Sequence, residues 1–404
     1  MFGSSPPQYP SVFKDESKLD LQYVPSRLPH RDLQINLLNH FFRFAIESPG
    51  KMTQRVLISG KIGTGKTVVS QHFGLNITKE AQSRGINLHY VHINCRECRG
   101  SLFLIVQRPI MEFYPHFPKR GYTEEELLQM LIQVLDEKNA FLILTLDELE
   151  ALIQAEGSDP LYKLTRVQED RINAPRRLSL ICVLRETGYL ESLDPSTKST
   201  LQRNFIHMGE YSKPQLQDIL KDRASLAFRY GVLSENVVEL IADLAAAEGG
   251  DARYAVDLLW RAGKFADASG SREVLPEYVR EAIVNIYPTV EKNLISSLGI
   301  HQKIFLLGVA RVFKQTHAAY VSMGEAEEAY AIVCEEHDKK RRGHTQLWKY
   351  VQELSALGII GTKPSSVGQR GKTTLISLLK IPAVDLEEEL SKHFERGAES
   401  FLAD

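Results

Sequence analysis

The chain has 404 residues, of which 43% are hydrophobic and 25% are charged, and its formal net charge is -2 at pH 7. This composition is typical of a globular protein of two or three domains with an ample core. The sequence has no apolar run of bilayer length, no N-terminal signal pattern and too few cysteines for a disulfide framework. We therefore expect an intracellular protein with no membrane contact, and the near-zero charge neither favours nor excludes nucleic acid as a partner.

The N-terminal 20 residues are rich in proline, serine and charged side chains, which predicts a flexible arm. A turn bracketed by Pro25 and Pro29 follows this arm. An amphipathic helix that contains Phe41 and Phe42 comes next.

The most specific local pattern runs from Gly60 to Thr67 and fits G-x-x-x-x-G-K-[ST]. A strand-like apolar run precedes it and a helical pattern follows, which is the context that a phosphate-binding loop requires. In such a loop the backbone N–H groups surround phosphate oxygens, Lys66 supplies a positive charge to the β- and γ-phosphates, and the Thr67 hydroxyl is a ligand for Mg²⁺. We assign ATP or ADP with Mg²⁺ to the loop residues Gly60, Lys61, Ile62, Gly63, Thr64, Gly65, Lys66 and Thr67.

After this loop, residues 88–94 alternate as in a strand. A segment with several aromatic residues, from Leu102 to Phe117, follows and contains Arg108. A capping box at residues 123–126 then opens an amphipathic helix.

The cysteines offer one alternative chemistry. Cys95 and Cys98 form a C-x-x-C, but no second pair stands at zinc-ligand spacing, so zinc or dithiol chemistry is the less favoured interpretation. Cys182 lies in an apolar run and is predicted to be a core residue.

An apolar run from Phe141 ends in two acids, Asp147 and Glu148. Such a run predicts a central strand of a parallel sheet, whose carboxyl end is where ligands bind in open α/β folds. Asp147 is predicted to hold Mg²⁺ together with Thr67, and Glu148 to orient the attacking water. A solvated acidic turn is the alternative. With a further buried strand at residues 178–184, these elements predict an α/β base over residues 21–211.

The pattern from residue 212 to residue 287 is helical only and predicts a lid, one helix of which opens at Gly249–Arg253. Residues 288–404 are predicted to form a winged-helix domain. Its three helices are expected over residues 292–313, 324–338 and 344–357, and its two strands around residues 368–372.

A basic run ending in Arg341 and Arg342 precedes the third of these helices, where phosphate contacts anchor helix-turn-helix proteins. A solvated turn is the alternative interpretation of this run. The predicted DNA-binding residues are Arg341 and Arg342 in the turn, His344, Thr345, Gln346 and Lys349 on the helix, and Arg370 and Lys372 at the tip of the wing.

The order and spacing of these motifs, over nearly the whole chain, resemble those of the archaeal replication initiators of the origin recognition complex and cell division control family. These initiators are AAA+ ATPases with a P-loop α/β domain, a helical lid and a winged helix. The resemblance rests on Tyr23-Val-Pro with Leu28-Pro-His-Arg31, Gly60–Thr67, Leu146-Asp-Glu148, Leu193-Asp-Pro195 with Lys198-Ser199, and Gly250-Asp-Ala-Arg-Tyr-Ala255.

The resemblance implies roles for further residues. Val24, Pro25 and Arg31 are expected beside the adenine, and Tyr211 is assigned to the same cofactor site. Arg253 is expected to be the lid arginine that senses the γ-phosphate and takes part in catalysis. The segment around Arg108 is similar to the initiator-specific insertion that touches DNA.

Several positions depart from the family pattern. Arg185 stands where a polar residue, commonly Asn, ends a strand, and Ser196 stands where an arginine usually follows Leu-Asp-Pro. Thr200 occupies the position of the trans-acting arginine of eukaryotic relatives, so no arginine finger is evident, although Lys198 or Arg203 could substitute. We therefore expect ATP hydrolysis to be slow at most.

These observations predict an ATP-regulated replication initiator that binds double-stranded origin DNA and helps to load the replicative helicase, with other initiator copies as further partners and the nucleoid, in the cytoplasm, as its location. A P-loop signalling ATPase with a winged helix that regulates transcription is the alternative, but it does not explain the Tyr23–Arg31 segment. A motor-type AAA+ enzyme such as a branch-migration helicase needs an arginine finger, which Thr200 does not supply.

Overall fold

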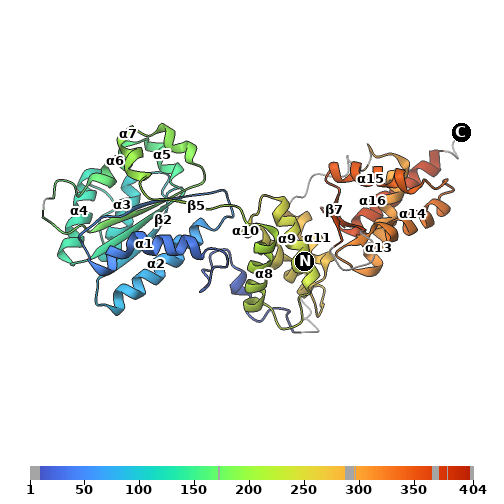
Figure 1. The fold of residues 1–404 in the computed structure, drawn as a ribbon, viewed down its shortest axis with the longest axis horizontal. Helices are drawn as coiled ribbons and strands as arrows, with labels where there is room; N and C mark the ends of the chain where they lie inside the picture. The colour runs from blue at the N-terminus through green and yellow to red at the C-terminus, as the bar shows by residue number, and fades with distance from the viewer. Residues whose placement is uncertain are drawn as a thin grey trace. The chain divides into compact units, whose positions relative to one another are not determined.

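The computed structural model describes residues 10–171, 173–286, 295, 297–365, 373–379 and 381–400. The chain forms two compact units (Figure 1). The ATPase unit is Gln22–Gln215 with Gly249–Arg253, and the C-terminal unit is Met1–Leu21, Leu216–Glu248 and Tyr254–Asp404.

The ATPase unit is built on a five-stranded parallel sheet in the order β2-β3-β4-β1-β5. The strands are β1 (Arg55–Ser59), β2 (Leu88–Asn94), β3 (Phe141–Asp147), β4 (Leu178–Leu184) and β5 (Phe205–His207). The parallel α/β sheet predicted from the sequence is thus confirmed.

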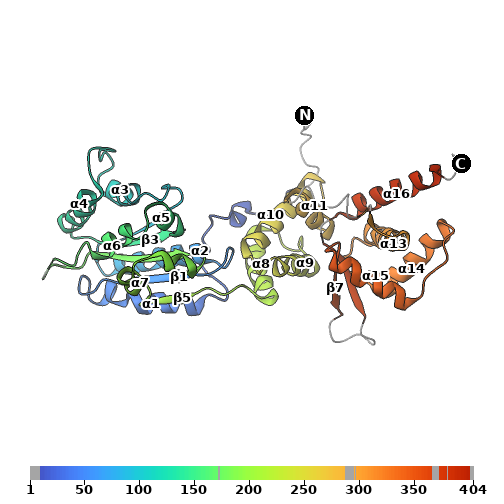
Figure 2. The same cartoon turned by 90° about the horizontal axis from the view of Figure 1, so that it is seen from above.

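Helices cover both faces of this sheet (Figure 2). Because successive side chains of a strand point to opposite faces, Leu57 packs with the helices of one layer while Val56 and Ile58 pack with the other. The first layer contains α3 (Leu102–Phe113), α4 (Glu124–Glu137), α5 (Glu150–Glu156) and α6 (Asp159–Arg166). The second contains α1 (Asp32–Glu47) and α2 (Lys66–Ser83). After β4 come η2 (Thr187–Ser192) and α7 (Pro195–Leu201).

The C-terminal unit contains the lid helices and the winged helix. The lid helices are α8 (Lys213–Ala227), α9 (Glu235–Ala247), α10 (Ala252–Ala268) and α11 (Pro276–Ile286). The winged helix consists of α13 (Ile300–Thr316), β6 (Val321–Ser322), α14 (Met323–Glu336), α15 (His344–Ala356), β7 (Ile360–Pro364), β8 (Thr374–Leu378) and α16 (Ala383–Ser400), with an antiparallel sheet in the order β6-β8-β7. The predicted winged-helix arrangement is confirmed.

The segment before η1 (Glu16–Leu19) differs from the flexible arm that we expected over residues 1–20, of which residues 10–20 are described. Val12 and Phe13 are buried, and the Phe13 ring lies 4.7 Å from that of Phe228. The Ser11 hydroxyl donates a hydrogen bond of 2.6 Å to Asp267. Apolar burial against partners more than 200 residues away therefore holds this segment on the lid.

Polar contacts join the lid helices to the winged helix within the C-terminal unit. The Tyr320 hydroxyl donates to Asp243 at 2.6 Å, and the Lys363 ammonium donates to Glu239 at 2.7 Å. Arg280 is fully buried and donates to the carbonyls of residues 318 and 319. The lid and the winged helix, which the sequence divides at residue 287, therefore form one compact unit.

Within the described part of the chain, no helix is both long enough and apolar enough to cross a membrane.

Candidate functional site: a P-loop nucleotide site and a winged-helix surface

The loop between β1 and α2 has a conformation that glycine makes possible. Gly63 and Gly65 adopt left-handed φ values of 75° and 87°. A Cβ atom on Gly63 would lie 1.9 Å from the Asp251 carboxylate, and one on Gly65 would lie 2.9 Å from the Tyr211 hydroxyl. These glycines therefore allow the close approach of both neighbouring side chains, which a larger residue would prevent.

Lys66 is the buried cation of this loop. Its ammonium donates hydrogen bonds to the carbonyls of Gly60 at 2.6 Å and Lys61 at 2.7 Å. Burial lowers the pKa of Lys66, because a charged amine loses hydration there. By contrast, the side chains of Lys61 and Ile62 are exposed, and Lys61 forms an ion pair with Glu210 at 2.5 Å.

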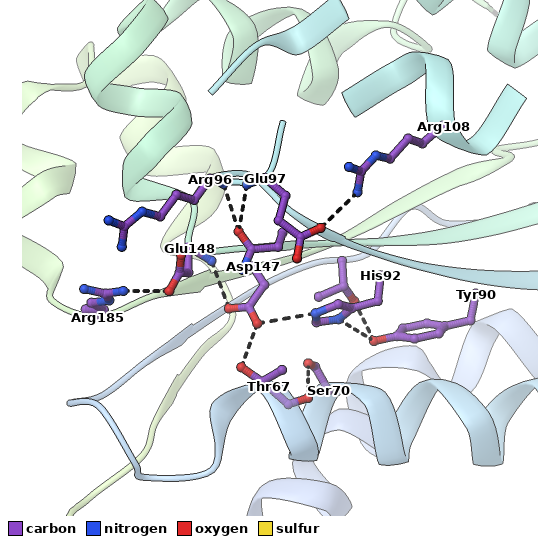
Figure 3. A network of polar contacts seen from close by, with 12 residues as sticks. Thr67, Ser70, Tyr90, His92, Arg96, Glu97, Arg108, Asp147, Glu148 and Arg185 are labelled. Atoms are coloured by element: carbon purple, nitrogen blue, oxygen red, sulfur yellow. Dashed lines mark hydrogen bonds and ion pairs between the residues drawn. The ribbon is translucent and has the colours of Figure 1, made fainter. Parts of the chain in front are cut away.

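Thr67 and Asp147 meet across the ends of α2 and β3 (Figure 3). The Thr67 hydroxyl donates to Asp147 Oδ2 at 2.6 Å, and His92 Nε2 lies 3.3 Å from the same oxygen. Burial acts to raise the pKa of Asp147, but the hydrogen bonds from His92 and Thr67 outweigh burial and hold that pKa below its usual value. Asp147 is therefore a carboxylate at neutral pH, next to the threonine hydroxyl.

His92 is a residue of this site that the sequence analysis missed. The Thr145 hydroxyl donates to the Tyr90 hydroxyl at 3.1 Å. The Tyr90 hydroxyl in turn lies 3.3 Å from His92 Nδ1 (Figure 3). With Tyr90 donating to Nδ1, the Nε2–H of His92 is left to donate to Asp147. Burial raises the pKa of Tyr90 to about 12, so its hydroxyl keeps its proton. The alternation of residues 88–94 predicts the direction of this side chain, but not its partner.

Glu148 directly follows β3 and is paired with a cation. Arg185 Nη2 donates to Glu148 Oε1 at 2.6 Å (Figure 3). Arg185 Nε also lies 3.1 Å from Glu150 Oε1. The departure from the family pattern at residue 185 thus places a guanidinium against the acid that was predicted to orient water.

Arg31 supports the loop from the side of its backbone. Its guanidinium donates to the Thr64 carbonyl at 2.7 Å and to the Gly209 carbonyl at 2.8 Å, and lies 3.8 Å from the centre of the Tyr211 ring. Arg31 is 5% exposed, so its contacts are with the loop backbone. Together with Tyr211, it fixes the position of the phosphate loop.

The Val24–Pro25 segment contacts α2. Pro25 is buried, and its carbonyl accepts a hydrogen bond of 3.0 Å from His72 Nδ1. Asn76 Nδ2 lies 2.8 Å from His72 Nε2, which fixes the Nδ1–H tautomer. The role of Val24, Pro25 and Arg31 beside an adenine stays a prediction.

The Gly249–Arg253 segment contacts the phosphate loop within the ATPase unit. The Ala252 N–H donates to the Gly63 carbonyl at 3.2 Å, and the Arg253 N–H donates to Asp251 at 2.8 Å. Arg253 itself is exposed. Burial is the main cause of the lowered pKa of Lys66, and the positive charge of Arg253 also acts to lower it. The structure therefore brings this segment to the loop, as the proposed γ-phosphate role requires.

The C-x-x-C residues Cys95 and Cys98 are free and buried, as is Cys182. Burial raises the pKa of the thiol of Cys98, which disfavours the thiolate needed for dithiol chemistry or metal ligation. Among the described residues, no group of three or more His, Cys, Asp or Glu side chains is arranged to hold a metal ion.

The predicted DNA-binding residues lie in three places. Arg108, on α3 of the ATPase unit, is 45% exposed at its side chain and forms an ion pair with Glu97 at 3.5 Å. Arg341 and Arg342 are exposed in the turn before α15, where Arg341 pairs with Glu335. The wing-tip residues Arg370 and Lys372 lie outside the described residues.

The faces of α15 follow from its buried residues, which are Leu347, Val351 and Leu354. A helical period of 3.6 then directs Thr345, Lys349 and Gln352 away from the core, with Trp348 beside them and Gln346 half-buried at the edge of this face. His344 instead pairs with Glu327 of α14. Trp348 is 39% exposed and was not predicted, although the same helical period could have revealed it.

The fold and the site together define a P-loop AAA+ protein with a winged helix. Family models match the chain as a Cdc6 AAA+ ATPase-type lid domain over residues 217–284 and a CDC6 C-terminal winged helix domain over residues 293–389.

Similar proteins agree with this class. The chain is 35% identical to ORC1-type DNA replication protein 2 of Sulfurisphaera tokodaii over 94% of this chain and 91% of that protein. It is 32% identical to the ORC1-type DNA replication protein of Thermococcus kodakarensis over 92% and 89%. The crystal structure of Cdc6p from Pyrobaculum aerophilum matches with a TM-score of 0.84 and 31% identity, covering 96% of this chain and 100% of that one. The chain therefore belongs to the family of ORC1-type DNA replication proteins.

Another solved structure, the Aeropyrum pernix ORC1 protein in complex with DNA, matches with a TM-score of 0.63 and 30% identity, and covers 94% of this chain and 97% of that one.

Proposed function

We propose that this protein is an ATP-regulated replication initiator that binds double-stranded origin DNA and helps to load the replicative helicase. The observation that supports nucleotide binding most directly is the arrangement of Lys66, Thr67 and Asp147 around one loop. A buried ammonium on the loop backbone and two adjacent oxygen groups are what a nucleoside triphosphate with a divalent cation requires.

The residues fit magnesium by their chemistry. Thr67 and Asp147 offer a hydroxyl and a carboxylate oxygen 2.6 Å apart, and oxygen is the ligand that Mg²⁺ prefers. When bound, the ion would neutralise charge on the β- and γ-phosphates. His92 would still donate to Asp147 and so fix the direction of the carboxylate.

Regulation by ATP is supported by the Gly249–Arg253 segment. It contacts the phosphate loop, and the chain passes from it directly into the C-terminal unit at Tyr254. A γ-phosphate contact by Arg253 would give ATP and ADP different affinities for two positions of this segment, which is the condition for a nucleotide to shift a conformational equilibrium.

DNA binding is supported by the exposed face of α15 and by the DNA complex of the Aeropyrum pernix ORC1 protein. In this proposal α15 enters the major groove, and Arg341 and Arg342 contact phosphates beside it. Recruitment of the helicase and of other initiator copies is proposed from family membership. An initiator bound in this way would lie with the nucleoid.

The test is footprinting on candidate origins of the protein's own chromosome, with ATP and with ADP. We expect a protected site whose extent or strength differs between the two nucleotides. Identical protection with ATP, with ADP and without nucleotide would contradict ATP regulation, and protection of promoters alone would favour a transcription regulator.

A further inference from the structure

Two acids and one arginine meet at the carboxyl edge of the sheet. Because β3 and β4 are neighbouring parallel strands, the residues that follow them, Glu148 and Arg185, emerge side by side. Arg185 Nη2 donates to Glu148 Oε1 at 2.6 Å (Figure 3). The predicted water-orienting carboxylate is thus already an acceptor for a fixed cation.

A second acid holds the arginine in this place. Arg185 Nε lies 3.1 Å from Glu150 Oε1, and the Glu150 side chain is 9% exposed. Neither oxygen of Glu150 has a partner at good hydrogen-bond geometry, so the ion pair with Arg185, together with nearby backbone N–H groups, offsets its burial. Burial raises the pKa of Glu150, and the hydrogen bond with Glu148 raises the pKa of Arg185. Removing the guanidinium would leave Glu150 with a greater desolvation penalty.

The backbone at Glu148 is also constrained. Its φ of 51° is left-handed, which is unfavourable for a residue with a Cβ. The Glu148 N–H donates to Asp147 Oδ1 at 2.9 Å, which fixes the peptide next to the Mg²⁺-binding acid. Both the backbone and the side chain of Glu148 are therefore held by specific partners.

We propose that Arg185 inhibits ATP hydrolysis by holding Glu148 in an ion pair, and that release of this pair is what permits turnover. The inference rests on the proposed function. In hydrolysis the water oxygen bonds to the γ-phosphorus, and the bond from that phosphorus to the bridging oxygen breaks. ADP leaves with the electron pair of the broken bond. Glu148 accepts the hydrogen bond, and then the proton, of the attacking water.

A carboxylate that accepts from a guanidinium serves this purpose poorly. Oε1 already accepts from the guanidinium, and the ion pair fixes the direction of the carboxylate, so Glu148 is not free to turn toward the attacking water. Arg185 is thus a positioning residue that acts through Glu148. The expected slow hydrolysis then has two causes at residue 185. Arg185 holds Glu148 in an ion pair, and the polar side chain of the family pattern is absent.

The test compares Arg185→Asn with the intact protein in single-turnover hydrolysis and in fluorescent-nucleotide titration. We expect hydrolysis to rise at least about tenfold, with the Kd for nucleotide unchanged within about twofold, because general-base catalysis contributes about 100-fold or more. Arg185→Lys keeps the charge but cannot contact two carboxylates with one planar group, so its rate is expected to lie between the two. Arg84→Asn removes the exposed Arg84–Glu80 pair and is the matched control, expected to change nothing.

Two further measurements test whether the gain in hydrolysis comes from the released Glu148 carboxylate or from a general loss of order in the site. The double variant Arg185→Asn with Glu148→Gln should lose the gain entirely, because no carboxylate remains to be released. In the nucleotide-free protein, the decrease in melting temperature of the double variant should be smaller than the sum of the decreases caused by Arg185→Asn and Glu148→Gln, since both remove the Arg185–Glu148 pair.

Normal nucleotide binding by Arg185→Asn with hydrolysis at or below the intact rate would overturn the inference, because Arg185 would then assist catalysis. Additive melting-temperature decreases would also overturn it, by showing that the pair does not form in solution. Absence of nucleotide binding by the intact protein would instead overturn the proposed function, and the inference with it.

Discussion

Lys66 and Arg185 illustrate how one charged side chain can acquire a role from its surroundings. Both sit at the edge of the same sheet, but Lys66 is buried on loop carbonyls, whereas Arg185 lies between carboxylates. A cation that contacts only neutral carbonyls retains its attraction for phosphate, and one that is already paired with acids does not.

Lys66→Ala is expected to weaken nucleotide binding at least about a hundredfold, because removing one partner of a buried charge pair costs about 2–5 kcal/mol. Fluorescent-nucleotide titration measures this loss. Lys79→Ala, which removes an exposed lysine from the same helix α2, is the matched control. Equal binding by Lys66→Ala and the intact protein would show that the loop is not a phosphate site.

Hydrolysis by the intact protein alone is expected to be at most about a few turnovers per hour. The Thr200 hydroxyl donates to the Ser196 carbonyl and supplies no positive charge to the transition state. Arg185 holds Glu148 in an ion pair. Each missing element of phosphoryl transfer typically lowers the rate by orders of magnitude. Glu148→Gln is expected to bind ATP normally and to lose the remaining turnover. A rate near one per second without partners would contradict both expectations and point to Lys198 or Arg203 as a substitute.

Strands and helices were predictable from the sequence where their pattern is local. Strands β1, β3 and β4 are mainly apolar runs, β2 shows an alternating pattern, and the winged-helix segments are separated by clear turns. β5 has only three residues, too few for a periodic signal, and was missed. The N-terminal segment was misjudged because its burial depends on Phe228 and Asp267, which no local pattern near Val12 and Phe13 reveals.

The candidate site followed the same division. Gly60–Thr67 and Asp147 were identifiable, because a loop that binds phosphate requires particular residues at fixed spacing. The contacts of His92 with Asp147 and of Arg185 with Glu148 arise from neighbouring parallel strands. No single segment of the sequence predicts which strands are neighbours in the sheet, so these partners could not be assigned from the sequence.

The turn before α15 and the exposed face of α15 are expected to act differently on DNA. Arg341→Ala or Arg342→Ala should weaken binding to every duplex and lower the salt dependence by about one unit per lost phosphate contact. Gln346→Ala should mainly relax sequence preference, by about 1–3 kcal/mol. Titrations of specific and random duplexes over a range of salt concentrations measure both effects. Lys392→Ala on α16 is the control, and loss of affinity for one sequence only in Arg341→Ala would contradict the phosphate role.

Trp348 offers a direct optical test of the same face. The chain has two tryptophans, and Trp260 donates a hydrogen bond of 2.7 Å to Glu16 in the lid region, apart from α15. In a Trp260→Phe variant, duplex DNA is expected to change the emission of Trp348, because its exposed ring would lose water on binding. A Trp348→Phe variant, which retains Trp260, should show no such change. The same response from both variants would count against contact by α15.

The molecule as a whole consists of an ATPase unit and a unit in which lid and winged helix are joined. Lys363 and Tyr320 both bond to the acids of α9, and Arg280 is buried where α11 meets the loop between α13 and β6. These contacts tie the lid to the winged helix, and under the proposed function they offer a route by which a nucleotide-dependent change in the lid would reach α15.

In the proposed function, the winged helix reads origin DNA under control of the bound nucleotide. The most direct measurement is a footprint on the protein's own origin DNA with ATP, comparing the intact chain, a full-length Lys349→Glu variant, and a chain ending at Tyr287. The full-length variant guards against misfolding, since the lid packs on the winged helix. We predict a footprint for the intact chain, none for Lys349→Glu, and only weak binding without a footprint for the shortened chain. A footprint from the shortened chain equal to that of the intact protein would contradict the account and make the ATPase unit the main reader of DNA.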